Sequence, residues 1–256
     1  QDSRSKRIHA VLVKQLMATV ADCLKGVQER VDAAVQERAK ASGNPPQPVR
    51  LVAVSKTKPV EALLEAYDAG QRHFGENYVQ ELIDKVPQLP SDIQWHFIGT
   101  LQSNKVAMLL KGCPNLACLE TITSEKLARA VDKACGSPGL RVMVQVNSSG
   151  EESKNGVDPA ECAEVCRIIA EECPSLQLAG LMTIGAPDYS GCRTEDFETL
   201  FKCRDEVVEA TGIAVENLEL SMGMSSDFEN AIREGSSSVR VGSSIFGARS
   251  YPAKIS

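Results

Sequence analysis

Apolar positions in the first part of the chain recur at three- and four-residue steps, with charged residues between them. They are Val13, Leu16, Val20, Leu24, Val27 and Val31. Because this spacing places them on one face of a helix, the pattern predicts an amphipathic helix from Ser5 to Ala41. The proline-rich segment Gly43–Pro48 predicts the end of that helix, since proline lacks an amide donor and disfavours helical geometry at the residue before it.

Beyond this segment, short apolar runs alternate with helical patterns. The run Arg141–Asn147 is the clearest strand, because Val142, Val144 and Val146 occupy every second position. Seven further runs predict strands over Leu51–Ser55, Arg72–Phe74, Trp95–Ile98, Leu116–Glu120, Leu178–Met182, Leu218–Ser221 and Ser238–Val241. The predicted helices between them are Val60–Gly70, Asn104–Lys111, Ser124–Cys135, Pro159–Glu172, Thr194–Thr211 and Phe228–Glu234.

This alternation indicates a parallel sheet, because parallel neighbours are joined by crossovers that are usually helical. Eight strands can close, so we expect a single (β/α)8 barrel over residues 45–256, with residues 1–44 forming an N-terminal helix and linker that pack on it. An open doubly wound sheet is the alternative, although no Gly-x-Gly-x-x-Gly motif follows the first predicted strand. Either fold places ligands at the carboxyl ends of the strands.

The composition changes this picture little but excludes several classes of protein. Of the 256 residues, 43% are apolar and 24% are charged, which is typical of a soluble globular domain. The formal net charge of −6 argues against a general electrostatic attraction to nucleic acid or anionic lipid. The apolar runs are also far shorter than the roughly 20 residues that span a bilayer. From the charge and the run lengths together, we expect neither a nucleic-acid nor a membrane partner. No apolar face is left obviously uncovered, so we expect a monomer.

Nine cysteines, an odd number, show no disulfide-framework spacing. We therefore expect a reducing compartment, with a cytoplasmic location as the first choice. A mitochondrial or other organellar location stays open, because the chain begins at Gln1 and not at an initiator methionine. The histidines His9, His73 and His96 are too scattered for a metal triad, so we expect no metal site.

One lysine stands at the end of the first predicted strand. Period-two alternation puts Lys56 on the same face as Val52 and Val54, which in a barrel is the interior. Partial burial lowers the pKa of a lysine amine, which can then attack a carbonyl carbon and form a Schiff base. The alternative is that Lys56 only extends from the strand end into solvent.

Two loops rich in small residues, Ser221–Asp227 and Gly242–Gly247, follow the last two predicted strands. Such loops commonly bind phosphate in barrels, because small residues let amides and hydroxyls approach the anion. Arg240 alternates with Val239 and Val241, so it lies on the opposite face of the strand with Ser238 and Gly242, and it needs either a structural carboxylate or a ligand group as partner. A carbonyl-seeking lysine, a phosphate loop and an arginine together fit pyridoxal 5′-phosphate (PLP), which carries an aldehyde, a phosphate and a pyridine nitrogen.

Six longer segments extend this pattern from about residue 50 to the C-terminus. They are 53–59 (AVSKTKP), 74–81 (FGENYVQE), 95–105 (WHFIGTLQSNK), 180–182 (GLM), 220–225 (LSMGMS) and 239–243 (VRVGS). Together they resemble the pyridoxal phosphate homeostasis protein family. The resemblance implies a single (β/α)8 barrel of the kind called fold type III for PLP proteins, related to the N-terminal domain of alanine racemase.

The resemblance also implies roles for individual residues. Lys56 would hold PLP as an aldimine, Asn77 would lie beside the cofactor ring, and Arg240 would face the pyridine nitrogen. The other cofactor-binding residues that it implies are Met182, Ser221, Met222, Met224, Ser225, Gly242 and Ser243. It implies no catalytic residue, and it matches Lys154 to a family lysine suggested as a secondary acceptor in cofactor transfer.

Arginine stays protonated beside a pyridine nitrogen and leaves that nitrogen neutral, which weakens the electron sink needed for carbanion chemistry. Racemases with this barrel add a second domain that supplies a catalytic tyrosine, whereas only 16 residues follow Arg240 here. The leading hypothesis is therefore a non-catalytic protein that holds PLP, supplies it to PLP-requiring apoenzymes and takes part in vitamin B6 homeostasis. The alternatives are a PLP-dependent amino acid racemase or lyase, and a Schiff-base aldolase without a cofactor.

Overall fold

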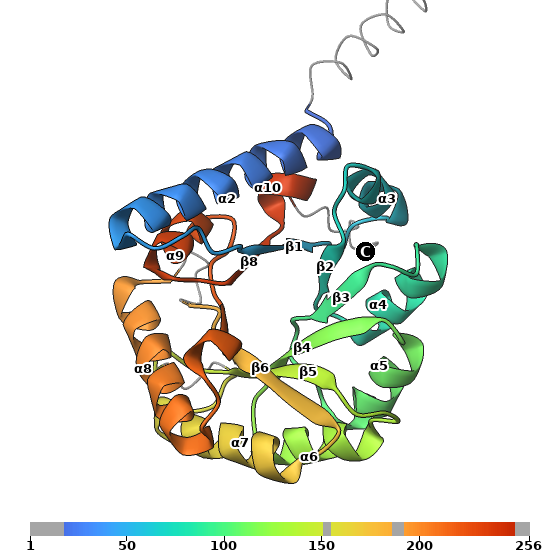
Figure 1. Cartoon of the computed structure of the whole chain (residues 1–256). Helices are drawn as coiled ribbons and strands as arrows, with labels where there is room; N and C mark the ends of the chain where they lie inside the picture. Colours follow the sequence, from blue (N-terminus) through green and yellow to red (C-terminus); the bar gives the residue numbers. More distant parts are fainter. Residues whose placement is uncertain (1–17, 151–154, 186–191, 249–256) are drawn as a thin grey trace, which may run out of the picture.

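The computed structural model describes residues 18–150, 155–185 and 192–248. Within this part of the chain, eight parallel strands form a closed barrel in the order β1 to β8, with helices outside it (Figure 1). The strands are β1 (Arg50–Val54), β2 (His73–Glu76), β3 (Gln94–Phe97), β4 (Leu116–Ile122), β5 (Leu140–Gln145), β6 (Leu176–Met182), β7 (Glu219–Ser221) and β8 (Ser238–Val241). The predicted (β/α)8 barrel is confirmed, and the open doubly wound sheet is wrong because β1 pairs with β8.

A helix follows each strand along the chain. These helices are α3 (Val60–Asp68), α4 (Val79–Lys85), α5 (Val106–Gly112), α6 (Glu125–Ala134), α7 (Pro159–Glu172), α8 (Thr194–Thr211), α9 (Phe228–Glu234) and α10 (Ser243–Phe246). Helix α4 is not predicted by the apolar pattern, because it has only seven residues and its two buried side chains are Leu82 and Lys85. A buried lysine in so short a segment gives no helical apolar stripe.

The remaining helix, α2 (Val20–Ser42), completes the outer ring beside β8 and β1 (Figure 1). It packs against α9, α10 and α3, and it covers a flank where α10 is only four residues long. The prediction of an unbroken helix from Ser5 is wrong, because Thr19 is extended and forms a capping box with Asp22. Residues 1–17 lie outside the described part. Although α2 has 23 residues, no described helix is both long and apolar enough to cross a membrane.

The strand alternation predicted around Lys56 and Arg240 is present in the barrel. Val239 and Val241 belong to the core between sheet and helices, whereas Arg240 faces the barrel interior. Arg240 pairs in register with Val52 on the neighbouring strand. Lys56 lies four residues after Val52, so period-two alternation puts both on the same face. The two predicted functional side chains therefore come from adjacent strands.

The nine cysteines are all free thiols. Six of them are buried, including Cys162 and Cys166 of α7, which faces α8 in the helical layer. Burial raises the pKa of the Cys192 thiol to about 12, which keeps that group protonated. These thiols thus behave as small apolar side chains.

Candidate functional site

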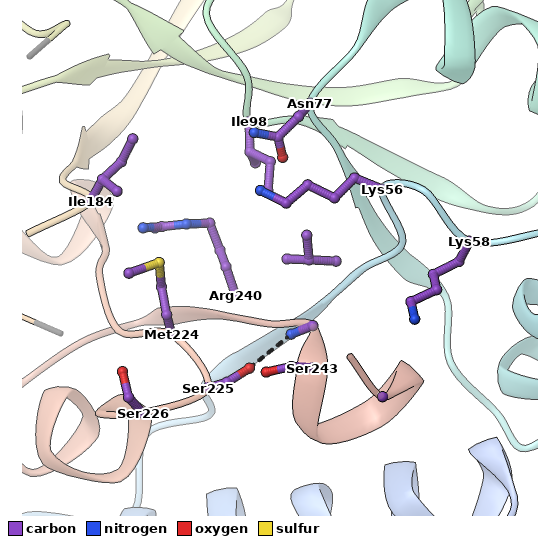
Figure 2. A pocket seen from close by; sticks show the side chains of 13 residues that line it. Lys56, Lys58, Asn77, Ile98, Ile184, Met224, Ser225, Ser226, Arg240 and Ser243 are labelled. Carbon is purple, nitrogen blue, oxygen red and sulfur yellow. Dashed lines mark hydrogen bonds between the residues drawn. The ribbon is translucent and has the colours of Figure 1, made fainter. Parts of the chain in front are cut away.

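A cavity of about 290 Å³ opens at the carboxyl ends of the strands (Figure 2). Its walls come from β1, β8 and the segments after β1, β2, β3, β6, β7 and β8. The described lining residues are Val54, Lys56, Lys58, Asn77, Ile98, Ile184, Met224, Ser225, Ser226, Arg240, Gly242, Ser243 and Gly247. The volume is close to the lower end of the range for small-molecule sites.

Lys56 follows β1, and its side chain extends into the cavity (Figure 2). The next residue, Thr57, has φ 62° and is the one non-glycine residue with positive φ in the described part of the chain. Its amide donates to Glu81 Oε1 at 2.6 Å. Lys58 also lines the cavity, but its Nζ donates to the carbonyl oxygen of Ala248 at 2.7 Å, and burial lowers its pKa. Of the two lysines, Lys56 is therefore the one that reaches the centre of the cavity.

Asn77 enters the cavity from the loop after β2, opposite the serine-rich loops (Figure 2). Its backbone crosses the segment after β3 so closely that a Cβ at Gly99 would lie 1.9 Å from the Asn77 carbonyl oxygen. Only glycine allows this approach. The side-chain oxygen of Asn77 is buried and has no hydrogen-bond partner among the described residues, so a bound ligand with a donor group would satisfy it.

Two serine-bearing segments form the opposite wall. The Ser225 hydroxyl accepts a hydrogen bond from the amide of Gly242 at 3.2 Å and so joins the loop after β7 to the loop after β8. Ser226 and Ser243 line the same side. A Cβ at Gly242 would meet the Val54 carbonyl oxygen at 3.2 Å, so this backbone lies tightly against β1. Hydroxyls and first-turn amides gathered in this way can bind an oxyanion.

Arg240 crosses the floor of the cavity with only 4% of its surface exposed. Its Nη1 donates to Ser221 Oγ at 2.6 Å, and its Nη2 donates to the carbonyl oxygen of Thr183, also at 2.6 Å. The carboxylate of Glu120 lies 4.0 Å away. Arg240 therefore has a buried carboxylate nearby, as the structural interpretation predicts, and it also lines the cavity, as the ligand-binding interpretation predicts.

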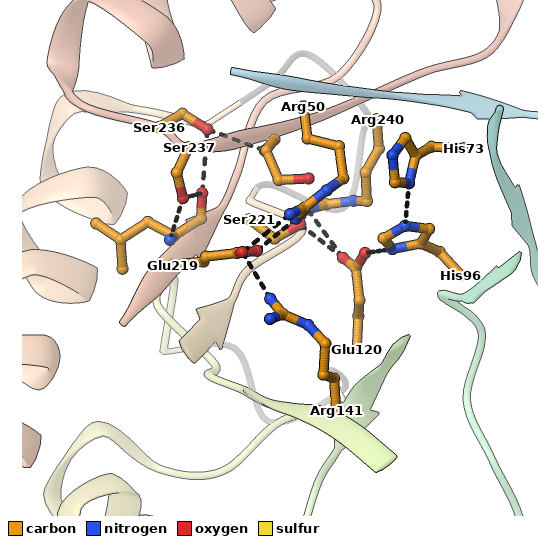
Figure 3. A network of polar contacts seen from close by, with 12 residues as sticks. Arg50, His73, His96, Glu120, Arg141, Glu219, Ser221, Ser236, Ser237 and Arg240 are labelled. Atoms are coloured by element: carbon orange, nitrogen blue, oxygen red, sulfur yellow. Dashed lines mark hydrogen bonds and ion pairs between the residues drawn. The ribbon is translucent and has the colours of Figure 1, made fainter. Parts of the chain in front are cut away.

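A chain of buried polar groups continues from Arg240 through the barrel interior (Figure 3). Ser221 Oγ donates to Glu120 Oε2 at 2.6 Å, and Glu120 Oε1 lies 2.6 Å from His96 Nδ1. His96 Nε2 in turn lies 3.1 Å from His73 Nδ1. An ionised carboxylate only accepts hydrogen bonds, so His96 Nδ1 carries the proton in this arrangement.

The charges in this chain are set by burial and by its neighbours. Burial alone raises the pKa of Glu120, but the hydrogen bond from His96 and the charge of Arg240 outweigh it and lower that pKa to about 2. Burial and the nearby His96 lower the pKa of His73 to about 4. At neutral pH, Glu120 is therefore an anion that fixes the guanidinium of Arg240, and His73 is neutral.

The structure brings together most of the residues that the sequence singles out. Those that line the cavity are Lys56, Asn77, Met224, Ser225, Arg240, Gly242 and Ser243. Ser221 instead lies between Arg240 and Glu120, while Met182 and Met222 are fully buried below the lining. Lys154 lies outside the described residues.

Sequence reasoning missed the apolar walls formed by Ile98 and Ile184. It placed Val54 on the interior face, and Ser226 and Gly247 in the two predicted phosphate loops, but it did not name these three as site residues. Isoleucine after a strand carries no signal that separates a cavity wall from ordinary core. Ser226 directly follows Ser225 in the predicted phosphate loop. A second adjacent hydroxyl was therefore the sequence feature that could have indicated Ser226 as a lining residue.

Comparisons with known proteins find relatives that cover most of this chain. The family described as alanine racemase, N-terminal domain, matches residues 30–250. A pyridoxal phosphate homeostasis protein from Bos taurus is 50% identical over 242 residues, which cover 90% of this chain and 88% of that protein. A structure of PipY from Synechococcus elongatus with PLP bound has a TM-score of 0.65 and 35% identity, over 83% of this chain and 100% of that chain. Alanine racemase from Corynebacterium glutamicum, at 18% identity and a TM-score of 0.63 over 90% of this chain and 63% of that chain, shares the fold.

Proposed function

The chain belongs to the pyridoxal phosphate homeostasis protein family, and from that premise we propose that it binds PLP in the cavity at the carboxyl ends of the strands. The observation that carries the proposal is that Lys56, the serine-bearing loops and Arg240 all line one cavity. Bound PLP in PipY, a relative that is 35% identical, supports it.

Each wall of the cavity matches one part of PLP. Lys56 extends from the end of β1 and would hold the aldehyde, whereas the hydroxyls of Ser225, Ser226 and Ser243 would hold the phosphate. Arg240 would face the pyridine nitrogen. The buried side-chain oxygen of Asn77 needs a donor, and a ring hydroxyl would supply one.

The covalent step that we propose is formation of an aldimine at Lys56. The uncharged amine adds to the aldehyde carbon, the new C–N bond becomes a C=N bond, and one molecule of water leaves. PLP supplies a reversible imine linkage and an electron sink when it is bound. The residues of this chain hold the phosphate, orient the ring and exclude water from the apolar walls at Ile98 and Ile184.

We further propose that the protein serves intracellular PLP homeostasis as a carrier that supplies apoenzymes, and not as an enzyme. Among the described residues that line the cavity, the ionisable groups are Lys56, Lys58 and Arg240, and none is a tyrosine, histidine or acid. The guanidinium of Arg240 is held by Ser221 and Thr183, and an arginine beside the ring favours a neutral pyridine nitrogen and weak carbanion stabilisation. The names of the relatives agree with a homeostatic role.

The test is the visible absorption of the purified protein mixed with PLP, before and after borohydride reduction, followed by peptide mapping. We expect a reducible yellow adduct on Lys56 that Lys56→Ala abolishes and Lys58→Ala retains. A reduced adduct on another lysine, or an unchanged spectrum, would refute the site. Of these two results, the unchanged spectrum would also favour the cofactor-free aldolase.

The carrier role is tested with the loaded protein and a PLP-requiring apoenzyme. We expect the apoenzyme to regain activity in the presence of a scavenger that removes free PLP. Turnover of free amino acids by the loaded protein at rates typical of enzymes, about 1 per second or more, would overturn the carrier role in favour of a racemase or lyase.

A further inference from the structure

A buried group of charged residues lies beneath the turn that carries Lys56. Lys85 of α4 extends under this turn, and its side chain is only 7% exposed. Its Nζ donates to Glu76 Oε1 at 2.7 Å, to Glu81 Oε1 at 2.6 Å and to the carbonyl oxygen of Ser55 at 2.9 Å. We call Lys85, Glu76 and Glu81 the Lys85 cluster. None of the three lines the cavity.

The Lys85 cluster binds the backbone on both sides of Lys56. On the preceding side, Lys85 holds the Ser55 carbonyl, and the Ser55 hydroxyl donates to Glu76 Oε1 at 2.7 Å. On the following side, Glu81 Oε1 accepts the amide of Thr57 at 2.6 Å. Because Glu76 is fully buried and Lys85 nearly so, water does not compete effectively for the bonds among Lys85, Glu76 and Ser55, whereas Glu81 is 23% exposed.

Thr57 is the residue in this turn that most needs to be held. It has φ 62°, a left-handed conformation that is uncommon for any residue except glycine and is a clear outlier for a β-branched one. Its hydroxyl is buried and has no hydrogen-bond partner among the described residues, so that hydroxyl does not stabilise the conformation. The charged acceptor on Glu81 is the stabilising contact on the amide side of Thr57.

We propose that Glu81 and Lys85 are positioning residues for Lys56. Glu81 holds Thr57 in its left-handed conformation, and Lys85 fixes Glu81 and the Ser55 carbonyl, so that the turn directs the amine of Lys56 into the cavity. The inference rests on the proposed function, because the reaction that it governs is covalent capture of PLP by Lys56.

The test is the rate of covalent PLP capture, followed by visible absorbance after rapid mixing. Glu81→Ala removes the acceptor for the Thr57 amide, and we expect capture to slow by about tenfold or more. Glu81→Gln keeps an acceptor oxygen and should restore most of the rate. Thr57→Gly in the Glu81→Ala background should also restore it, because glycine adopts a positive φ without steric cost.

Gln80→Ala is the matched control, since Gln80 lies on the same helix and is exposed. Its rate should equal that of the unchanged protein. If Glu81→Ala lowers the melting temperature but captures PLP at the normal rate, the positioning role is overturned. Failure of Thr57→Gly to restore the rate would overturn the link through the left-handed turn. If the unchanged protein forms no reducible adduct, the proposed function falls first and this inference falls with it.

Discussion

The two ends of the barrel are both hollowed and both carry arginines, but their charges are arranged differently. At the carboxyl end, the described lining contains Lys56, Lys58 and Arg240 and no acidic residue. The amino end has a larger hollow, of about 940 Å³, whose lining includes Arg50 and Glu219. The comparison shows that size does not identify the site. The two linings differ in their acids, because the cations at the carboxyl end have no carboxylate beside them in the described lining, whereas the arginines of the larger hollow are accompanied by Glu216 and Glu219.

At the amino end, the polar groups bind one another. Arg50 Nη2 donates to Glu219 Oε1 at 3.0 Å, and Arg141 Nη2 donates to the same oxygen at 2.6 Å (Figure 3). The charges of both arginines, together with the hydrogen bonds from them, lower the pKa of Glu219 despite its burial. These three side chains tie β1, β5 and β7 together, so their role is to hold the barrel closed.

A continuous chain of polar contacts joins the two ends. His73 lines the hollow at the amino end, and the contacts through His96, Glu120 and Ser221 lead from it to Arg240 at the cavity. The comparison can therefore be tested. Either the amino end contributes stability alone, or changes there reach the binding site along this chain.

The largest effect is expected from Glu219→Ala at the amino end. This change leaves Arg50 and Arg141 close to each other without their shared carboxylate. We expect the free energy of unfolding to fall by about 3 kcal/mol, in the lower part of the range for a broken buried pair because these groups are partly exposed. Urea unfolding measures the loss, and PLP titration of the folded protein should give a dissociation constant within about twofold of the unchanged one.

Arg129→Ala is the control for Glu219→Ala. Arg129 also pairs with two acids, Glu125 and Glu172, but on an exposed helical surface, so its loss should lower the free energy of unfolding far less than Glu219→Ala does. A tenfold weaker PLP affinity in Glu219→Ala would show that the two ends are coupled.

The opposite pattern is expected at the carboxyl end from the double change Ser225→Ala and Ser243→Ala. Removing two hydroxyls that face the predicted phosphate should weaken PLP binding by about 30- to 150-fold, at roughly 1 to 1.5 kcal/mol for each lost hydrogen bond. Stability should change little, because Ser243 is exposed and Ser225 makes one bond to the amide of Gly242. Equilibrium titration and thermal melting measure the two effects.

Thr199→Ala serves as the hydroxyl control, because Thr199 is half-buried on α8, away from the cavity lining, and its hydroxyl donates to the Glu195 carbonyl oxygen. Unchanged PLP affinity in the double serine variant would place the phosphate elsewhere in the cavity.

Much of the barrel could be predicted because its elements carry strong local signals. The bounds of α7, α8, α9 and β8 agree with the sequence pattern at both ends. The start of α2 was wrong, because the apolar spacing continues before Thr19 and hides the capping box that begins the described helix. Local periodicity gives the type of an element more reliably than its ends.

The site was predictable where it depends on strand alternation and unpredictable where it depends on distant partners. Alternation alone places Lys56 on the interior face and separates Arg240 from Val239 and Val241. The bond between Ser221 and Glu120 joins residues 101 positions apart, so no local pattern indicates that this hydroxyl is used inside the barrel. Lys85 was missed for the same reason, since its acceptors are on Ser55, which follows β1, and on Glu76 of β2.

The smallest effect is expected from His73→Asn. Because the pKa of His73 is lowered from 6.5 to about 4 in the fold, the unfolded chain binds a proton more readily as the pH falls from 6.5 to 4. Stability is therefore lost over that window. The variant should lose about 1 kcal/mol less between pH 7 and pH 5, once the partial exposure of His73 is allowed for.

Glu120 does not obscure this measurement. Its pKa is lowered from 4.5 to about 2, so its contribution is present above pH 4.5 and is lost only as the pH falls toward 2. Urea unfolding at pH 8, 7, 6 and 5 thus isolates His73, and equal pH dependence in both proteins would mean that its pKa is ordinary. If His73→Asn also weakens PLP binding at pH 7, where the histidine is neutral, the effect comes from the broken contact with His96. The chain to Arg240 then transmits changes from one end of the barrel to the other.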